Sequence, residues 1–412
     1  MALPVPSERV KKFESMGFGM FIHYGLYSQL DGGEWAMHMK NIPPREYAKL
    51  KDNFTAEAFD AEKIVLLAKS AGMKYITMGT RHHEGFSLYD TKDLSGYNSV
   101  NSPAKRDLVA EFVKACGKHG ISPFLYHTTL DWYQEMYKTD FDKYLEYLRR
   151  SVELLCTNYG SIGGLWFDGN WDRSDGDWKL DELYGTIRRY QPEAIIVNNT
   201  GLEARGRLSH PEIDSVTFEQ GRPEPLNREG MEKYVTGEMC QTMNDNWGIS
   251  MSDLKYKSPA ELIENLCACR KAGANYLLNV GPTAGGAILE IQKEIIRILG
   301  KWMSINGRAI YEGRPCAVKG RHEDFALESG DGRIYLFIHK LHVQGHPNVT
   351  LGTDIYGTRE FCRVNRDVAN IRWLDNGEEL RYTHDKESGI LRLEATGYPY
   401  GKNLVVRVAE VL

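Results

Sequence analysis

The sequence lacks a long apolar run and an excess of either charge, and both absences narrow the possible functions. None of its 412 residues lies in a stretch of about 18 consecutive apolar residues, so we expect no transmembrane helix. The net charge of −5 predicts no basic surface for nucleic acid or an anionic membrane. The first residues, MALPVPSERVKKFESMG, also lack the apolar core of a signal peptide. We therefore expect a cytoplasmic protein.

Cysteine is scarce and irregularly spaced. The seven cysteines are odd in number and most lie in apolar segments, so we expect free buried thiols rather than a disulfide framework. Cys267 and Cys269 have the wrong spacing for a zinc knuckle, and no second pair follows. We expect neither a bound metal nor another cofactor.

Short apolar segments alternate with amphipathic helical patterns over the first three-quarters of the chain. This order predicts an α/β fold with a (β/α)8-type barrel. An open doubly wound sheet is the second candidate, but no glycine-rich dinucleotide turn follows the first strand. The expected strands are 19–24, 75–79, 122–126, 164–167, 194–198, 215–218, 234–240 and 276–280, and the main helices are 57–71, 103–119, 140–158, 176–190 and 258–272.

The pattern changes after an expected helix at 288–305. Segments 333–339, 370–374, 389–394 and 403–408 alternate apolar and polar residues, with Gly, Asn and Asp between them. Such alternation is typical of antiparallel strands with one buried face. We therefore predict a catalytic barrel over residues 1–310 and a small C-terminal antiparallel β-sandwich over 311–412.

Residues 164–171, GLWFDGNW, are the most informative segment. An apolar strand ends at Asp168, and Gly169 follows where the chain must turn. In a barrel, functional side chains gather at the carboxyl ends of the strands, so Asp168 is placed beside Trp166 and Trp171 at the mouth. Flat indole faces next to a carboxylate suit a sugar ring.

The other strand ends carry a compatible set of groups. His23 ends strand one, His82 and His83 follow strand two, His127 ends strand three, and Glu219 and Glu238 lie at strands six and seven. A metal-dependent hydrolase using the histidines is one alternative. Adjacent His82 and His83 on an extended segment would point in opposite directions, however, which favours carbohydrate chemistry.

Five motifs in order resemble those of the α-L-fucosidases of glycoside hydrolase family 29. Residues 19–25 (GMFIHYG) resemble G-x-F-x-H-W-G, 81–86 (RHHEGF) resemble K-H-H-D-G-F, and 166–171 (WFDGNW) resemble W-x-D-G-x-W. Residues 275–282 (NYLLNVGP) and 306–311 (NGRAIY) resemble N-x-L-L-N-x-G-P and N-G-E-A-I-Y. Tyr24, Arg81 and Glu84 depart from the family pattern, and the region after strand six is reworked. A related glycosidase acting on another sugar is therefore the alternative.

The resemblance implies a retaining exo-glycosidase that removes terminal α-L-fucosyl residues from a carbohydrate substrate. A homo-oligomer is one possible state of the protein. Asp168 is the expected nucleophile and Glu219 the expected acid/base, with Glu238 and Glu224 as alternatives. Such an acid needs a pKa raised by burial or by a neighbouring carboxylate. For the sugar methyl group, we expect an apolar pocket drawn from Tyr24, Trp166, Phe218 or Trp247. The expected sugar contacts are His23, Trp35, His82, His83, His127, Trp166 and Trp247.

Overall fold

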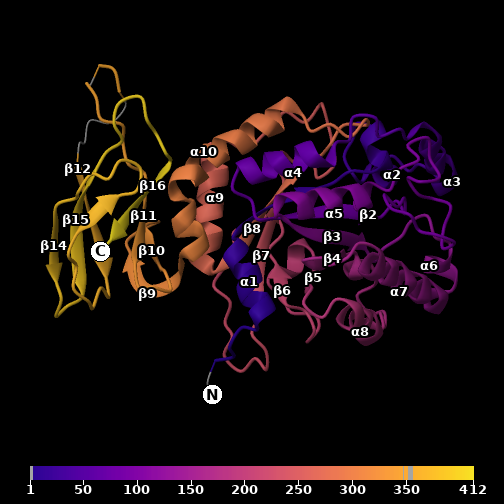
Figure 1. Ribbon diagram of the computed structural model, residues 1–412, viewed down its shortest axis with the longest axis horizontal. Coiled ribbons are helices and arrows are strands. Elements are labelled where there is room, and N and C mark those ends of the chain that lie inside the picture. Colours follow the sequence, from indigo (N-terminus) through magenta and orange to yellow (C-terminus); the bar gives the residue numbers. More distant parts are fainter. Residues whose placement is uncertain (1–2, 347, 351–355) are drawn as a thin grey trace. The chain divides into compact units, whose positions relative to one another are not determined.

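A computed structural model describes residues 3–346, 348–350 and 356–412, and Figure 1 shows its helices and strands. Eight parallel strands close into a barrel in sequence order. The predicted α/β barrel is therefore confirmed. The barrel strands are β1 (Phe18–Ile22), β2 (Tyr75–Arg81), β3 (Ser122–Thr128), β4 (Gly164–Asp168), β5 (Ile195–Asn198), β6 (Ser215–Thr217), β7 (Thr236–Gln241) and β8 (Ala274–Val280).

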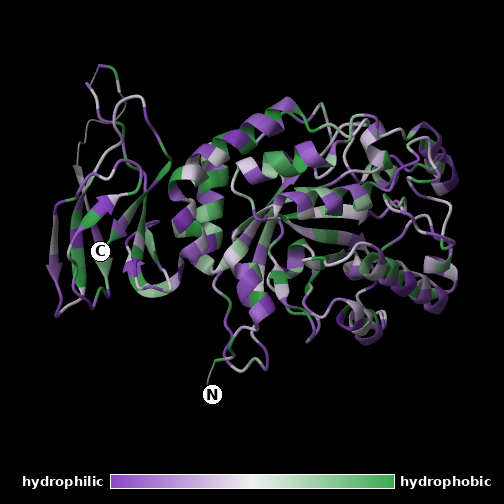
Figure 2. Ribbon diagram, viewed as in Figure 1, coloured by the Kyte–Doolittle hydropathy of each residue, from purple (hydrophilic) through white to green (hydrophobic). Residues whose placement is uncertain are grey.

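The longer helices begin where the sequence supplies a cap. Asp60, Asp107, Asp140 and Ser258 each accept a hydrogen bond from a backbone N–H in the first turn of the helix that follows. In Figure 2 these helices carry alternating hydrophobic and hydrophilic bands, the pattern of helices with one buried face. They are α4 (Ala61–Ser70), α5 (Leu108–His119), α7 (Phe141–Asn158) and α9 (Pro259–Ala272), to which α8 (Leu180–Tyr190) and α10 (Glu290–Glu312) are added.

Short helices lie in the loops that follow the barrel strands. No α-helix lies between β5 and β7, in agreement with the long loops expected there. The short α-helices are α2 (Ala36–Met39), α3 (Pro44–Tyr47) and α6 (Met136–Thr139), and the 3-10 turns are η1 (Leu26–Gln29), η2 (Ala48–Asn53), η3 (Asn170–Arg173) and η4 (Leu202–Ala204).

Helix α1 (Glu8–Met16) closes the amino end of the barrel. Its Val10 and Phe13 are buried in one cluster with inward-facing strand residues such as Tyr75 and Phe124. In Figure 1, α1 lies at one end of the strands, whereas α2, α3 and α6 lie at the other. This plug was not predicted from the sequence.

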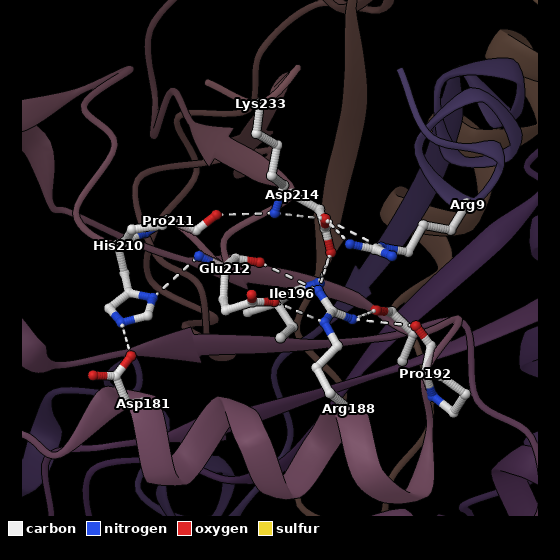
Figure 3. A network of polar contacts seen from close by, with 11 residues as sticks. Arg9, Asp181, Arg188, Pro192, Ile196, His210, Pro211, Glu212, Asp214 and Lys233 are labelled. Atoms are coloured by element: carbon white, nitrogen blue, oxygen red, sulfur yellow. Dashed lines mark hydrogen bonds and ion pairs between the residues drawn. The ribbon is translucent and has the colours of Figure 1, made fainter. Parts of the chain in front are cut away.

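A charged cluster holds the same amino end together. Asp214, fully buried just before β6, lies 3.0 Å from Arg9 of α1, 2.7 Å from Arg188 of α8 and 3.0 Å from Lys233. Its Oδ2 also accepts from the Ile196 amide. Figure 3 shows the three cations converging on this carboxylate. Burial opposes ionisation, but the hydrogen bond from Arg9 and the neighbouring cations hold the pKa of Asp214 below its usual value.

The C-terminal strands form a separate antiparallel sheet, as predicted. Its order is β13-β16-β11-β10-β9-β12-β15-β14. Trp373 of β13 donates to Thr396 of β15 at 2.8 Å, although these strands are far apart in that order. The sheet therefore curls over one apolar core. Its strands are β9 (Arg314–Gly320), β10 (Phe325–Glu328), β11 (Ile334–His339), β12 (Tyr356–Cys362), β13 (Ile371–Trp373), β14 (Tyr382–Asp385), β15 (Ile390–Thr396) and β16 (Val406–Val411).

The chain divides into two compact units, Met1–Lys257 with Asn275–Arg297, and Ser258–Ala274 with Ile298–Leu412. The second unit thus contains α9 and the end of α10 together with the antiparallel sheet. The predicted domain boundary between residues 310 and 311 stays a prediction. All seven cysteines are free thiols. Within the described residues, no helix is both long and apolar enough to cross a membrane.

Candidate active site

A pocket of about 450 Å³ opens at the carboxyl ends of the barrel strands. This volume lies within the range of about 300–1,000 Å³ that is usual for small-molecule sites. Aromatic rings, imidazoles and carboxyl groups line it, and no Lys or Arg is found among the described lining residues. Its lining includes Phe21, His23, Glu34, Trp35, His82, His83, Tyr126, Trp166, Asp168, Trp171, Asn199, Glu219, Gln220, Asp245 and Trp247.

Asp168 stands at the last position of β4, and its side chain reaches the pocket. Gly169 has a φ of 109°, and a Cβ there would lie 2.6 Å from Leu130 Cβ, so only glycine makes this turn without strain. Both strand-end features inferred from the sequence, the carboxylate and its glycine turn, are thus present.

Four donors surround the Asp168 carboxylate. Trp171 Nε1 lies 3.0 Å and Asn199 Nδ2 3.2 Å from Oδ1, while the Tyr126 hydroxyl lies 3.1 Å and His83 Nε2 3.4 Å from Oδ2. Burial alone would raise the pKa of Asp168, but the hydrogen bonds from His83, Trp171 and Asn199 and the charge of His83 bring it below its usual value. Asp168 is therefore ionised near neutral pH.

Glu219 is the second carboxyl group of the pocket. Its Oε2 accepts from Asn199 Nδ2 at 2.8 Å. Because the same nitrogen bonds Asp168, the two accepting oxygens lie within about 6 Å, which includes the ~5–5.5 Å separation of retaining glycosidases. Burial and the nearby Asp168 charge raise the pKa of Glu219 to about 7, against the opposing bond from Asn199. Glu219 thus holds a proton up to neutral pH.

Glu238 and Glu224 lie outside the pocket lining. Glu238 is buried inside the barrel, where its two oxygens accept from the Tyr75 hydroxyl and from Trp166 Nε1. Burial raises the pKa of Glu238 to about 7, but Glu238 is not among the residues that line the pocket. Glu224 is exposed in the loop after β6. The geometry therefore favours Glu219 among the three glutamates.

The histidines His23, His82 and His83 gather on one side of the pocket. Adjacent His82 and His83 do not point in opposite directions, as we expected, because they follow the end of β2 in a turn; their ring centroids are 4.2 Å apart. That expectation is wrong. Among the described residues, no group of three or more His, Cys, Asp or Glu side chains is arranged to hold a metal.

Hydrogen bonds fix two of these rings. Asn279 uses its amide N–H on the Trp247 carbonyl, so its oxygen accepts from His23 Nδ1 at 2.7 Å. The Thr128 hydroxyl donates to the Leu130 carbonyl and therefore accepts from His83 Nδ1 at 2.6 Å. Burial lowers the pKa of His23 to about 4 despite the Asn279 bond, and burial also lowers the pKa of His82 well below its usual value. Neutral His23 therefore presents Nε2 as an acceptor for a sugar hydroxyl.

His127 does not reach the pocket. Tyr126 and Thr128 point inward, so the side chain between them faces outward, as strand alternation requires. Its two nitrogens contact the Thr80 and Ser151 hydroxyls at 2.8 and 2.9 Å. We therefore remove His127 from the expected sugar contacts.

The apolar wall of the pocket differs from the expected one. Trp166 and Trp247 line it, but Tyr24 and Phe218 do not; Phe21 and Tyr126 take their place. The Phe21 ring lies 5.1 Å from Trp166 and 5.8 Å from Trp247, and Tyr126 stacks on Trp166 at 5.6 Å. Alternation along β1 and β3 was the signal that could have identified Phe21 and Tyr126.

Two further polar groups of the pocket, Asn199 and Glu34, were not among the expected site residues. Asn199 follows β5, and no expected site residue lay at the end of that strand. Trp171, which the sequence placed beside Asp168 at the mouth, lines the pocket. Glu34 accepts from the Trp247 and Gly248 amides at 3.0 and 2.8 Å, and so ties the loop after β1 to the loop after β7. Burial raises the pKa of Glu34 despite these bonds.

Known proteins share both the sequence pattern and this architecture. The family model described as alpha-L-fucosidase matches residues 5–308. The tissue alpha-L-fucosidase of Macaca fascicularis is 31% identical over 368 residues, which cover 82% of this chain and 76% of that protein.

Solved structures give the same relationship. Alpha-L-fucosidase isoenzyme 1 from Paenibacillus thiaminolyticus is 30% identical with a TM-score of 0.84, covering 98% of each chain. The Thermotoga maritima alpha-fucosidase, solved with a mechanism-based inhibitor, is 25% identical with a TM-score of 0.74, covering 100% of this chain and 97% of that one.

Proposed function

Because this chain belongs to the α-L-fucosidases of glycoside hydrolase family 29, we propose that it removes terminal α-L-fucosyl residues with retention of configuration. The observation that carries the proposal is the pair of neighbouring carboxyl groups in different protonation states, Asp168 ionised and Glu219 protonated. A retaining glycosidase needs one carboxylate as nucleophile and one carboxylic acid as proton donor.

In the first step, an Asp168 oxygen attacks the anomeric carbon and the bond to the leaving oxygen breaks. Glu219 gives its proton to that oxygen, so the leaving group departs as an alcohol and Glu219 becomes a carboxylate. In the second step, Glu219 takes a proton from water while the water oxygen attacks the anomeric carbon. The ester bond breaks, and fucose and the Asp168 carboxylate are released. The inhibitor described as mechanism-based in the Thermotoga relative fits such a route.

The remaining lining residues suit a 6-deoxy sugar. His23, His82 and His83 offer polar atoms for hydroxyl groups on one side. Phe21, Tyr126, Trp166 and Trp247 form an apolar wall for the C5 methyl group. Galactose would bury an extra hydroxyl against these rings without a partner, which costs free energy.

One experiment tests both parts of the proposal. The purified enzyme is offered matched nitrophenyl glycosides of α-L-fucose, galactose and arabinose, and the anomer first released is identified by NMR. We expect a kcat/KM at least about tenfold higher for the fucoside than for the galactoside, and the α-anomer as first product. Equal turnover of the galactoside would overturn the sugar assignment, and a β-anomer would overturn the retaining mechanism.

A further inference from the structure

Asn199 lies between the two reacting carboxyl groups. Its Nδ2 is 3.2 Å from Asp168 Oδ1 and 2.8 Å from Glu219 Oε2, and the residue is 4% exposed. A side-chain amide nitrogen carries two hydrogens. One amide therefore has a hydrogen for each carboxyl group.

Two hydrogen bonds to its carbonyl oxygen hold the Asn199 side-chain amide in this orientation. Asn199 Oδ1 accepts from the Thr217 hydroxyl of β6 at 2.8 Å and from the Gly201 amide at 3.3 Å. A rotated amide would place its carbonyl oxygen against Asp168 and Glu219 and would lose both of these bonds. The donors of Asn199 are thus committed to the carboxyl groups.

The two carboxyl groups depend on this amide to different extents. Asp168 keeps three other donors, Trp171, Tyr126 and His83, if Asn199 is removed. Glu219 accepts its side-chain hydrogen bond from Asn199. The charged or titratable groups around Glu219 are Asp168, Glu34, Cys240 and Arg205, and of these only Arg205 is a cation. Arg205 donates to the Glu219 main-chain oxygen rather than to its carboxyl group.

We propose that Asn199 is a positioning residue that lets Glu219 alternate between acid and base, by donating a hydrogen bond to the Glu219 carboxylate once its proton has gone. The proposal rests on the double displacement described above. In the first step Glu219 loses a proton and Asp168 loses its charge to the ester, so the negative charge moves from one oxygen bonded by Asn199 to the other. In the second step the charge returns. The amide bonds the charged oxygen in both states.

The predicted consequence is a shift of the whole pH profile, because a hydrogen bond to a carboxylate favours its ionised form. In Asn199→Leu, which fills the space without a donor, we expect the loss of kcat/KM at rising pH to occur about one pH unit higher. We also expect the fucosyl-enzyme to decay more slowly at acid pH, because Glu219 then stays protonated. An activated aryl fucoside should therefore show a burst of aryl alcohol followed by slow turnover.

Asn198→Leu is the matched control. Asn198 is the preceding residue, but it faces away from the pocket and bonds Tyr184 and Asn170. This variant should lower stability without moving either limb of the profile. Thr217→Val removes one of the two hydrogen bonds that orient the amide and leaves the one from Gly201, so it should shift the profile in the same direction by less. It also tests the proposal if Asn199→Leu does not fold.

Glu219→Gln separates failure of this proposal from failure of the mechanism. If the limb near pH 7 persists in Glu219→Gln, Glu219 is not the acid and the proposed mechanism falls. If that limb vanishes in Glu219→Gln but is unmoved in Asn199→Leu and Thr217→Val, only the role of Asn199 is overturned.

Discussion

The two ends of the barrel surround their buried carboxyl groups with different partners. At the amino end, one carboxylate, Asp214, meets the cations Arg9, Arg188 and Lys233. At the carboxyl end, Asp168 and Glu219 share a pocket whose described lining has no Lys or Arg. Cations fix the charge of Asp214 permanently. At the pocket, Asp168 is surrounded by hydrogen-bond donors and the His83 imidazole instead of Lys or Arg, and the proposed two-step displacement requires the negative charge to move between Asp168 and Glu219.

The largest expected effect is at Asp168. Asp168→Ala removes the proposed nucleophile, so kcat with an aryl fucoside should fall by at least about four orders of magnitude. The melting temperature should change little. Asp172→Ala, four residues later in the exposed loop, should keep kcat within about threefold of wild type. Retention of more than a tenth of kcat in Asp168→Ala rules out the nucleophile role.

The second prediction concerns Glu219 and pH. Because the acid form is needed and its pKa is about 7, kcat/KM should fall as pH rises through about 7. Glu219→Ala should lose about 10²–10⁴-fold in kcat/KM with a poor leaving group, and azide should restore turnover by forming a glycosyl azide of retained configuration. Glu224→Ala serves as the exposed control. A glycosyl azide from Glu238→Ala instead would reassign the acid.

The third prediction compares the ends directly through stability. Asp214→Asn leaves three cations around a neutral amide, so the free energy of unfolding should fall by about 3 kcal/mol. The activity of the folded fraction should be unchanged. Asp181→Asn, which changes the exposed partner of His210 in the same network of polar contacts (Figure 3), should cost less than about 1 kcal/mol. Urea denaturation measures the free energy of unfolding of both variants. Equal losses in the two would show that Asp214 does not stabilise the three cations around it.

Glu219→Gln should raise stability at alkaline pH, whereas Asp214→Asn lowers it. The folded-state pKa of Glu219 is raised, so its favourable contribution is full below the unfolded pKa and is lost as pH rises through about 7. Above that pH the glutamine variant should melt at a higher temperature than wild type. Asp214 has a lowered folded-state pKa, so its contribution is present above its unfolded pKa and is lost as pH falls through the folded value. Melting curves of wild type and both variants from pH 4 to 9 distinguish the contribution of Glu219 from that of Asp214.

The smallest predicted effects are at the histidines. His82→Ala or His83→Ala should lower kcat/KM by at least about tenfold without unfolding the protein, since the first loses a polar contact to the sugar and the second loses the contact of His83 with Asp168. His127→Gln should lower stability but leave KM unchanged, because its ring faces the helix layer. Unchanged kinetics in both pocket variants would make those residues structural.

The sequence predicted the barrel strands well because each is an apolar run bounded by turns. Asp168 and Glu219 followed from the rule that strand ends carry function together with the family motifs. Strand alternation, had it been applied, would have excluded His127 and identified Tyr126. The plug α1 and the orientation of Asn199 were not predictable, because Phe13 and Thr217 act through contacts between residues distant in sequence.

The most direct test of the account is to trap the intermediate. Wild type and Glu219→Gln are treated with 2-fluoro-fucosyl fluoride, digested, and analysed by peptide mass spectrometry. The fluorine slows both steps, while the fluoride leaves without an acid, so a fucosyl ester should accumulate in both proteins. The account predicts that the label lies on Asp168. A label on Glu219, Glu238 or any other residue, or no label in an enzyme that hydrolyses fucosides, would contradict it.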